Sequence, residues 1–173
     1  MSSPKTDPDH PDPGRAYLFV HRAGAHNLGH VGWAFQQEDG SLLCGSTENT
    51  GPHRVVPPGG DTTFWTRACV SEAEMLGEMR REHQPRPGEP NAYDAYKCTP
   101  VARPDAQGAR EAAARLREAG YNLLDNNCLH HALAILRVYG VPDGPGGLAS
   151  PRTHPGPNAC FGASLEEGQG TPL

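Results

Sequence analysis

The segment HVGWAFQQEDGSLLCGS, which begins at His30, constrains the fold more than any other part of the chain. Val31, Trp33 and Phe35 alternate with smaller or polar residues, and alternation with a period of two is typical of a half-buried strand. The Asp-Gly pair that follows is a strong signal for a tight hairpin turn. We therefore expect two antiparallel strands joined by this turn.

Other segments have the composition of strands or the periodicity of helices. Three are rich in aromatic and β-branched residues and are predicted strands: 16–20, 62–70 and 93–101. Three have apolar residues at helical spacing and are predicted helices: 71–83, 105–120 and 128–140. Ser71 and Glu74 form a capping box, whereas Gly120 and Gly140 are C-terminal stop signals. Because most strands come first and the helices gather toward the end, the expected class is α+β, an antiparallel sheet with packed helices.

The length of 173 residues fits one domain, which we expect over residues 15–141. Residues 1–14 contain four prolines and three aspartates, with no large apolar residue after Met1, and are predicted to be disordered. Residues 142–173 form a Gly/Pro-rich C-terminal tail. Its apolar anchors are Leu148, Phe161 and Leu165, so we expect it to be loosely held.

Charge and composition exclude several classes of partner. The net charge is -5 and the 15 Lys and Arg residues are scattered, so nucleic acid is not an expected partner. No apolar run reaches about 18 residues and the N-terminus has no signal-peptide core, which predicts a cytoplasmic protein without a membrane span. The five cysteines are odd in number and lack a CxxC pair, so we expect free thiols. The glycine pattern of RAGAHNLGH lacks the Lys-Ser/Thr of a P-loop, and no cofactor is expected.

Cys128 is the candidate nucleophile, in the segment DNNCLHHALAILRVYGV. Asn126 and Asn127 are both good N-cap residues, so Cys128 should lie in the first turn of a helix. Free backbone N–H groups and the positive end of the helix dipole favour an anion there, and thiols at helix N-termini have lowered pKa values. A small buried cysteine at a helix start is the alternative interpretation.

A cysteine nucleophile requires a base, and His21, His30, His130 and His131 are the candidates. His130 and His131 lie on the same predicted helix as the thiol, which restricts how they can approach it. His30 instead begins a strand between two glycines, where its ring could face the N-terminus of a packed helix. We therefore favour His30 as the general base.

The order GHVGWAF followed by YNLLDNNCLHHALAILRVYGV resembles the circularly permuted branch of the papain-like superfamily. Its relatives include the NlpC/P60 cell-wall peptidases, the lecithin:retinol acyltransferase-like proteins and the PPPDE peptidases. In these proteins the histidine strand precedes the cysteine helix, as in this chain. The resemblance implies a permuted papain-like cysteine-peptidase fold, with Cys128 as nucleophile and His30 as general base.

The resemblance also implies a polar orienting residue from the next strand. The segment SLLCGSTEN offers Ser46, Thr47, Glu48 and Asn49. Glu48 is preferred because a carboxylate can both fix the imidazole tautomer and stabilise the imidazolium.

The Cys128 N–H is the expected oxyanion donor, and the Asn126 side chain is a second candidate. Asn127, His131 and Trp33 are further candidates for lining the substrate site. Asn127 also fits a simple helix cap, and Trp33 also fits the core.

These residues predict a thiol hydrolase or acyltransferase that forms an acyl-Cys128 intermediate from a peptide, amide, ester or thioester substrate. A non-catalytic binding domain of the effector or immunity type on the same fold is the first alternative. A His-based metal protein is the second, using His21, His26 and His30. These three histidines lie on a turn broken by glycines, which no helix aligns as ligands.

Overall fold

The computed structural model describes residues 13–49, 55–81, 93–166 and 168–173, so the predicted disorder at the N-terminus falls almost entirely outside them. The strands are β1 (Gly14–His21), β2 (His30–Gln36), β3 (Leu42–Thr47), β4 (Phe64–Cys69), β5 (Ala95–Val101) and β6 (Thr171–Pro172). They form one six-stranded sheet in the order β4-β3-β2-β1-β5-β6, and each pairing is antiparallel. The prediction of an α+β protein with an antiparallel sheet is confirmed.

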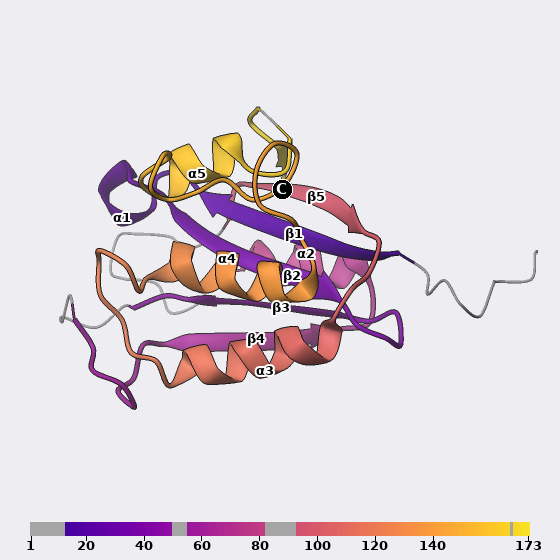
Figure 1. Ribbon diagram of the computed structural model, residues 1–173, viewed down its shortest axis with the longest axis horizontal. Helices are drawn as coiled ribbons and strands as arrows, with labels where there is room; N and C mark the ends of the chain where they lie inside the picture. The colour runs from indigo at the N-terminus through magenta and orange to yellow at the C-terminus, as the bar shows by residue number, and fades with distance from the viewer. Residues whose placement is uncertain (1–12, 50–54, 82–92, 167) are drawn as a thin grey trace, which may run out of the picture.

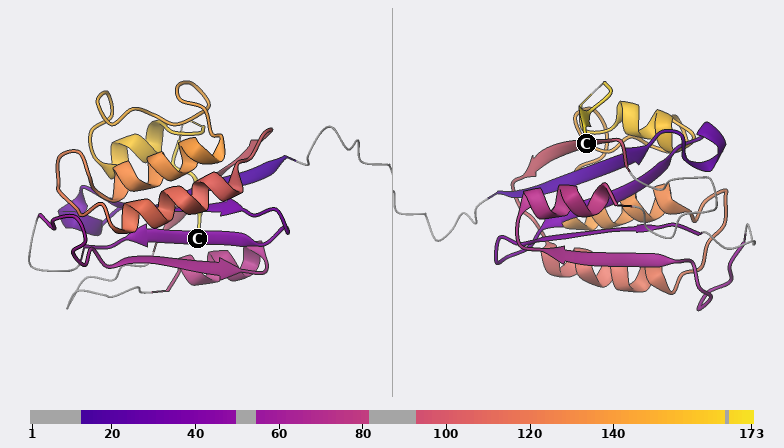
Figure 2. Two further views of the ribbon diagram at one scale, coloured as in Figure 1. Left: turned by 60° about the horizontal axis from the view of Figure 1, so that its bottom comes forward. Right: turned by 180° about the vertical axis from the view of Figure 1, so that it is seen from behind.

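Helices cover both faces of this sheet (Figures 1 and 2). They are α1 (Gly24–Asn27), α2 (Glu72–Met79), α3 (Ala106–Arg117), α4 (Cys128–Tyr139) and α5 (Pro157–Ala163). Helices α3, α4 and α5 share one apolar core with the sheet, and α2 closes a second core on the opposite face. Among the described residues, none of the helices has the length and apolarity that a bilayer crossing needs.

The predicted hairpin is formed by β2 and β3, which pair from Gly32↔Ser46 to Gln36↔Leu42. Gly40 has a φ of +84° in the turn, a conformation that glycine adopts without strain. Trp33 and Phe35 are fully buried, with stacked rings whose centroids are 5.7 Å apart. Trp33 is therefore a core residue, and the structure does not place it at a substrate site.

The predicted helix caps are present. The Ser71 hydroxyl accepts a hydrogen bond from the Glu74 N–H, and the Asp105 carboxylate accepts one from the Gly108 N–H. Helix α4 ends at Gly140, whose φ of +116° gives the left-handed C-cap that the sequence predicted.

The C-terminal segment differs from the expected loose tail, because it packs on the sheet through α5 and β6. All three of its expected anchors, Leu148, Phe161 and Leu165, are buried. The buried Lys97 ammonium of β5 also holds it. This group donates hydrogen bonds to the carbonyls of Phe161, Gly162 and Ser164 at 2.8, 2.9 and 2.9 Å, and to that of Glu166. A charged donor thus binds carbonyls at the end of a short helix, two of which, those of Phe161 and Gly162, also accept backbone hydrogen bonds.

Candidate active site

Cys128 and His30 meet at one end of the sheet, although they are far apart in sequence. Cys128 is the first residue of α4 and His30 is the first residue of β2, and these two elements pack together (Figure 1). The thiol and the imidazole lie close enough for each to shift the pKa of the other. Cys128 is only 6% exposed. The structure thus brings together the two residues that the sequence selected as nucleophile and base.

The turn that contains α1 covers the His30 side chain closely. A Cβ atom on Gly24 would lie 2.9 Å from the Cβ of His30 and 3.2 Å from Nδ1 of His21, so this position requires glycine. His21 pairs directly with His30 across β1 and β2. His21 is therefore a neighbour of the candidate base.

Glu48 follows β3 and contacts the imidazole of His30, as expected for an orienting residue. Its Oε2 lies 2.9 Å from His30 Nε2, and its side chain is 1% exposed. The hydroxyl of Ser46 also lies 3.0 Å from Nε2, and it donates its own proton to the Val31 carbonyl at 3.1 Å. Since a serine has one hydroxyl proton, Ser46 accepts from His30, as Glu48 does. Nε2 is therefore the protonated nitrogen, and Nδ1 is the nitrogen available to the thiol.

Two aromatic residues support the buried carboxylate of Glu48. The Trp65 indole Nε1–H donates to Oε1 at 2.7 Å, and the Tyr93 hydroxyl lies 3.5 Å from the same oxygen. The Tyr93 ring also stacks on His30, with ring centroids 5.7 Å apart. A buried carboxylate is tolerated when donors surround it, which is the case here.

The charges of these groups favour an ion pair. Burial lowers the pKa of His30, but the charges of Glu48 and Cys128 and the hydrogen bonds with both raise it, and this pKa lies well above the ordinary imidazole value. Burial raises the pKa of the Cys128 thiol. The His30 charge, the hydrogen bond with the His30 ring and a backbone hydrogen bond from Val31 lower it, and together they outweigh the effect of burial. The pKa of Cys128 therefore lies below the ordinary thiol value. Both directions favour a thiolate beside an imidazolium.

The N-terminus of α4 places backbone donors beside the thiol. Asn127 is the N-cap, and its side-chain oxygen accepts from the N–H groups of Leu129 and His130 at 3.0 and 3.3 Å. The Cys128 N–H has no acceptor among the residues that the structure describes, so an oxyanion could bind there. Asn127 thus caps α4, which is one of the two roles predicted for it from the sequence.

Asn126 and His131 are engaged in a separate network. His131 is buried, with Nδ1 2.8 Å from the Thr47 hydroxyl and Nε2 2.8 Å from the Asn126 side-chain oxygen. The amide nitrogen of Asn126 donates to the Ala119 carbonyl at 3.1 Å. These groups join β3 to the loop before α4, and one of the two N–H groups of the Asn126 amide is engaged by Ala119. Burial, followed by the charge of His130, lowers the pKa of His131 to about 4, so its ring is neutral near pH 7.

The sequence predicts strands that contain Trp65 and Tyr93 but gives neither residue a role at the site, so the support of Glu48 was missed. The only local signal is that a strand tryptophan has an N–H group that needs an acceptor when buried. The register that places Trp65 opposite Ser46, two residues before Glu48, becomes apparent only in the folded sheet.

The described residues contain no group of three or more His, Cys, Asp or Glu side chains that could hold a metal ion. The side chain of His26, one of the three histidines of the metal hypothesis, lies outside what the structure describes.

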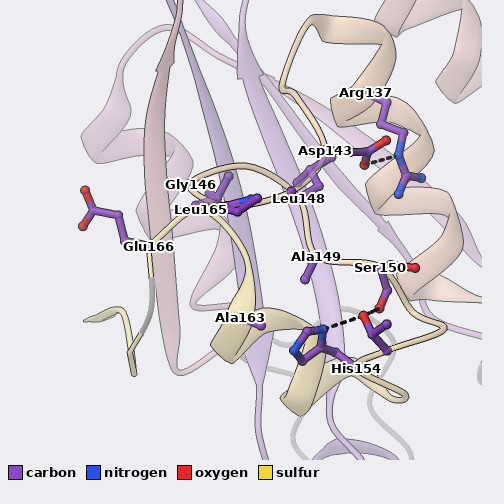
Figure 3. Close-up of a pocket in the computed structure, with 13 residues that line it drawn as sticks. Arg137, Asp143, Gly146, Leu148, Ala149, Ser150, His154, Ala163, Leu165 and Glu166 are labelled. Atoms are coloured by element: carbon purple, nitrogen blue, oxygen red, sulfur yellow. Dashed lines mark hydrogen bonds and ion pairs between the residues drawn. The ribbon is translucent and has the colours of Figure 1, made fainter.

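A pocket of about 790 Å³ lies between the loop after α4 and α5, and none of its lining residues belongs to the Cys128 cluster (Figure 3). Arg137 and Asp143 form an ion pair in this pocket, and Thr153 and His154 form a hydrogen bond, so its polar groups largely satisfy one another. These features provide no second centre of chemistry.

The chain has no significant match among protein-family models, curated proteins or solved structures.

Proposed function

We propose that this protein is a thiol enzyme with a permuted papain-like fold, which transfers an acyl group through a thioester on Cys128. The observation that supports this most strongly is the buried contact between Glu48 and His30, together with the electrostatic interaction of His30 with Cys128 at the start of α4. A nucleophile, a base that contacts it and a third group that orients the base are the components of nucleophilic catalysis.

In the proposed reaction, His30 holds the proton of the Cys128 thiol as an imidazolium. The thiolate attacks the carbonyl carbon of an amide, ester or thioester, and the carbonyl electron pair moves onto oxygen. The Cys128 N–H at the helix start stabilises this oxyanion. When the oxyanion collapses, the bond to the leaving group breaks and His30 donates its proton to that group, which leaves acyl-Cys128.

The second half of the reaction reverses these roles. Neutral His30 removes a proton from the acceptor, which attacks the thioester and releases Cys128 as the thiolate. With water as acceptor the enzyme is a hydrolase, and with an amine or alcohol it is an acyltransferase. Glu48 stabilises the imidazolium in both halves.

Trapping of the intermediate tests the proposal. The protein would be incubated with a small activated thioester near neutral pH, and acylated cysteines would be mapped by mass spectrometry. Cys98 is an exposed free thiol and serves as an internal reference. We expect acylation at Cys128 in the wild type and none there in His30→Gln. Acylation of Cys98 without acylation of Cys128 would contradict the enzyme proposal.

The 6% exposure of Cys128 is the observation that favours the second candidate, a non-catalytic binding domain on the same fold. In that case Cys128 is a buried small residue and no acyl-Cys128 forms with any activated substrate. The same experiment therefore separates the two candidates.

A further inference from the structure

We propose that Trp65 is a positioning residue for the proposed acyl transfer, because its indole N–H holds Glu48 in the orientation that directs the second carboxylate oxygen at His30. This inference rests on the proposed function, since it assigns Trp65 a role at that same site.

The argument begins with the geometry of the carboxylate. Trp65 Nε1 lies 2.7 Å from Oε1 of Glu48, and His30 Nε2 lies 2.9 Å from Oε2. A carboxylate is planar and rigid, so a short hydrogen bond to one oxygen fixes the direction of the other. The indole N–H can only donate, so this contact requires an acceptor at Oε1.

Hydrogen bonding also affects the charge of the carboxylate. The Glu48 side chain is 1% exposed, and a buried carboxylate depends on donors to remain ionised. Trp65 and Tyr93 both approach Oε1, but the Trp65 contact is much the shorter, at 2.7 Å against 3.5 Å. Loss of the indole donor should therefore weaken the negative charge that stabilises the His30 imidazolium.

The fold explains how Trp65 reaches the site. It lies on β4, the first strand in the sheet order, and pairs with Ser46 across β3 and β4. Ser46 and Glu48 lie two positions apart, where side chains of an extended chain share a side. The edge strand β4 thus contributes a side chain to the support of the candidate base.

The chain provides an internal reference, because the indole N–H groups of its two tryptophans differ in their hydrogen bonding. Trp33 is buried and its Nε1 has no hydrogen-bond partner among the described residues, whereas Trp65 donates to a carboxylate. Nuclear magnetic resonance resolves the indole N–H protons, and a single variant, Trp65→Phe, assigns both. We expect the Trp65 proton to lie downfield of that of Trp33.

The test compares these two resonances in the full-length protein before and after alkylation of Cys128, and in Glu48→Gln. We expect the Trp65 resonance to move in both cases while that of Trp33 stays in place. In Trp65→Phe, the His30 ring should lose its proton about one pH unit lower than in the wild type, corresponding to a tenfold change in its acid dissociation constant. The matched control is Phe64→Leu, on the same strand as Trp65. The Phe64 ring contacts Trp33 and His131, so its loss should leave the His30 titration unchanged.

A Trp65 resonance that does not respond to Glu48→Gln, or an equal His30 titration in Trp65→Phe and the wild type, would overturn the inference. Either result could coexist with trapped acyl-Cys128, in which case the proposed function stands without Trp65. Conversely, failure to trap acyl-Cys128 would refute the proposed function, whereas the resonance measurements would still report whether Trp65 holds Glu48.

Discussion

Substitution of Glu48 by glutamine should make the His30 imidazolium much less stable. Glutamine has the same shape, but the Trp65 N–H requires an acceptor at Oε1, so the amide oxygen takes that position. The amide NH₂ then faces His30 Nε2, 2.9 Å away in the wild type, and two donors oppose each other. The variant therefore removes the negative charge and also places a donor against the protonated nitrogen.

The expected magnitude follows from the contact that is lost. Hydrogen bonds to charged groups contribute about 1.5–3 kcal/mol. One pKa unit corresponds to about 1.4 kcal/mol, so the His30 pKa should fall by about 1–2 units in Glu48→Gln. Solvent screening should reduce this little, because the side chains of His30 and Glu48 are 11% and 1% exposed. Glu48 also repels the Cys128 thiolate, but more weakly than the His30 charge attracts it.

The assay is a pH titration of the His30 ring by ¹⁵N nuclear magnetic resonance, with the signal assigned by its loss in His30→Gln. Stability gives a second readout. Because the folded-state pKa of His30 is raised, the stability that its proton contributes is present at low pH and is lost as the pH rises through that pKa. The stability advantage of the wild type over Glu48→Gln should disappear over the same range. Superimposable titrations of the two proteins would refute the reasoning.

Three further substitutions should change stability in predictable ways. Burial lowers the pKa of His131 to about 4, so the free energy of unfolding of the wild type should fall by on the order of 3 kcal/mol as the pH falls from about 6.5 to 4. His131→Gln cannot titrate and should lose less. An equal dependence of the unfolding free energy on pH in the two proteins would contradict this. Asn127→Ala removes the cap of α4 and should lower the free energy of unfolding by about 1 kcal/mol, most of which Asn127→Ser should restore. An unchanged midpoint of urea unfolding in Asn127→Ala would show that the cap is unimportant. Lys97→Met removes a charged donor from four carbonyls and should lower the free energy of unfolding by about 3 kcal/mol, with faster hydrogen exchange in α5. Unaltered exchange there would mean that α5 is held by other contacts.

The sheet and the main helices could be predicted because their signals are local. The alternation around Trp33, the Asp-Gly turn and the caps at Ser71 and Asp105 each act over a few residues, and the structure has a strand, a turn or a helix at each. The C-terminal segment could not be predicted in this way. It is ordered by Lys97, whose partners lie more than sixty positions away in the sequence.

At the candidate site, too, some features could be predicted from local sequence signals and others depend on tertiary packing. Chain order and helix-cap chemistry predict Cys128 and His30 as partners, and the structure places them close enough to shift each other's pKa. His131 is a predicted candidate for lining the substrate site. The structure places its ring between Thr47 and Asn126, since the face of α4 on which it lies packs on β3. Which face of a helix meets a sheet depends on tertiary packing, and the pattern HH does not reveal it.

The most direct test of the central claim is a comparison of the alkylation rates of Cys128 and Cys98 by iodoacetamide at about pH 6–7. Cys98 is an exposed residue whose thiol is partly covered by neighbouring atoms, and this burial raises its pKa, whereas Cys128 is 6% exposed. If Cys128 is a thiolate beside the His30 imidazolium, it should be alkylated faster than Cys98 despite its low exposure, and His30→Gln should abolish that advantage. If Cys98 reacts first and Cys128 reacts only after denaturation, Cys128 is a buried structural thiol and the proposed chemistry is wrong.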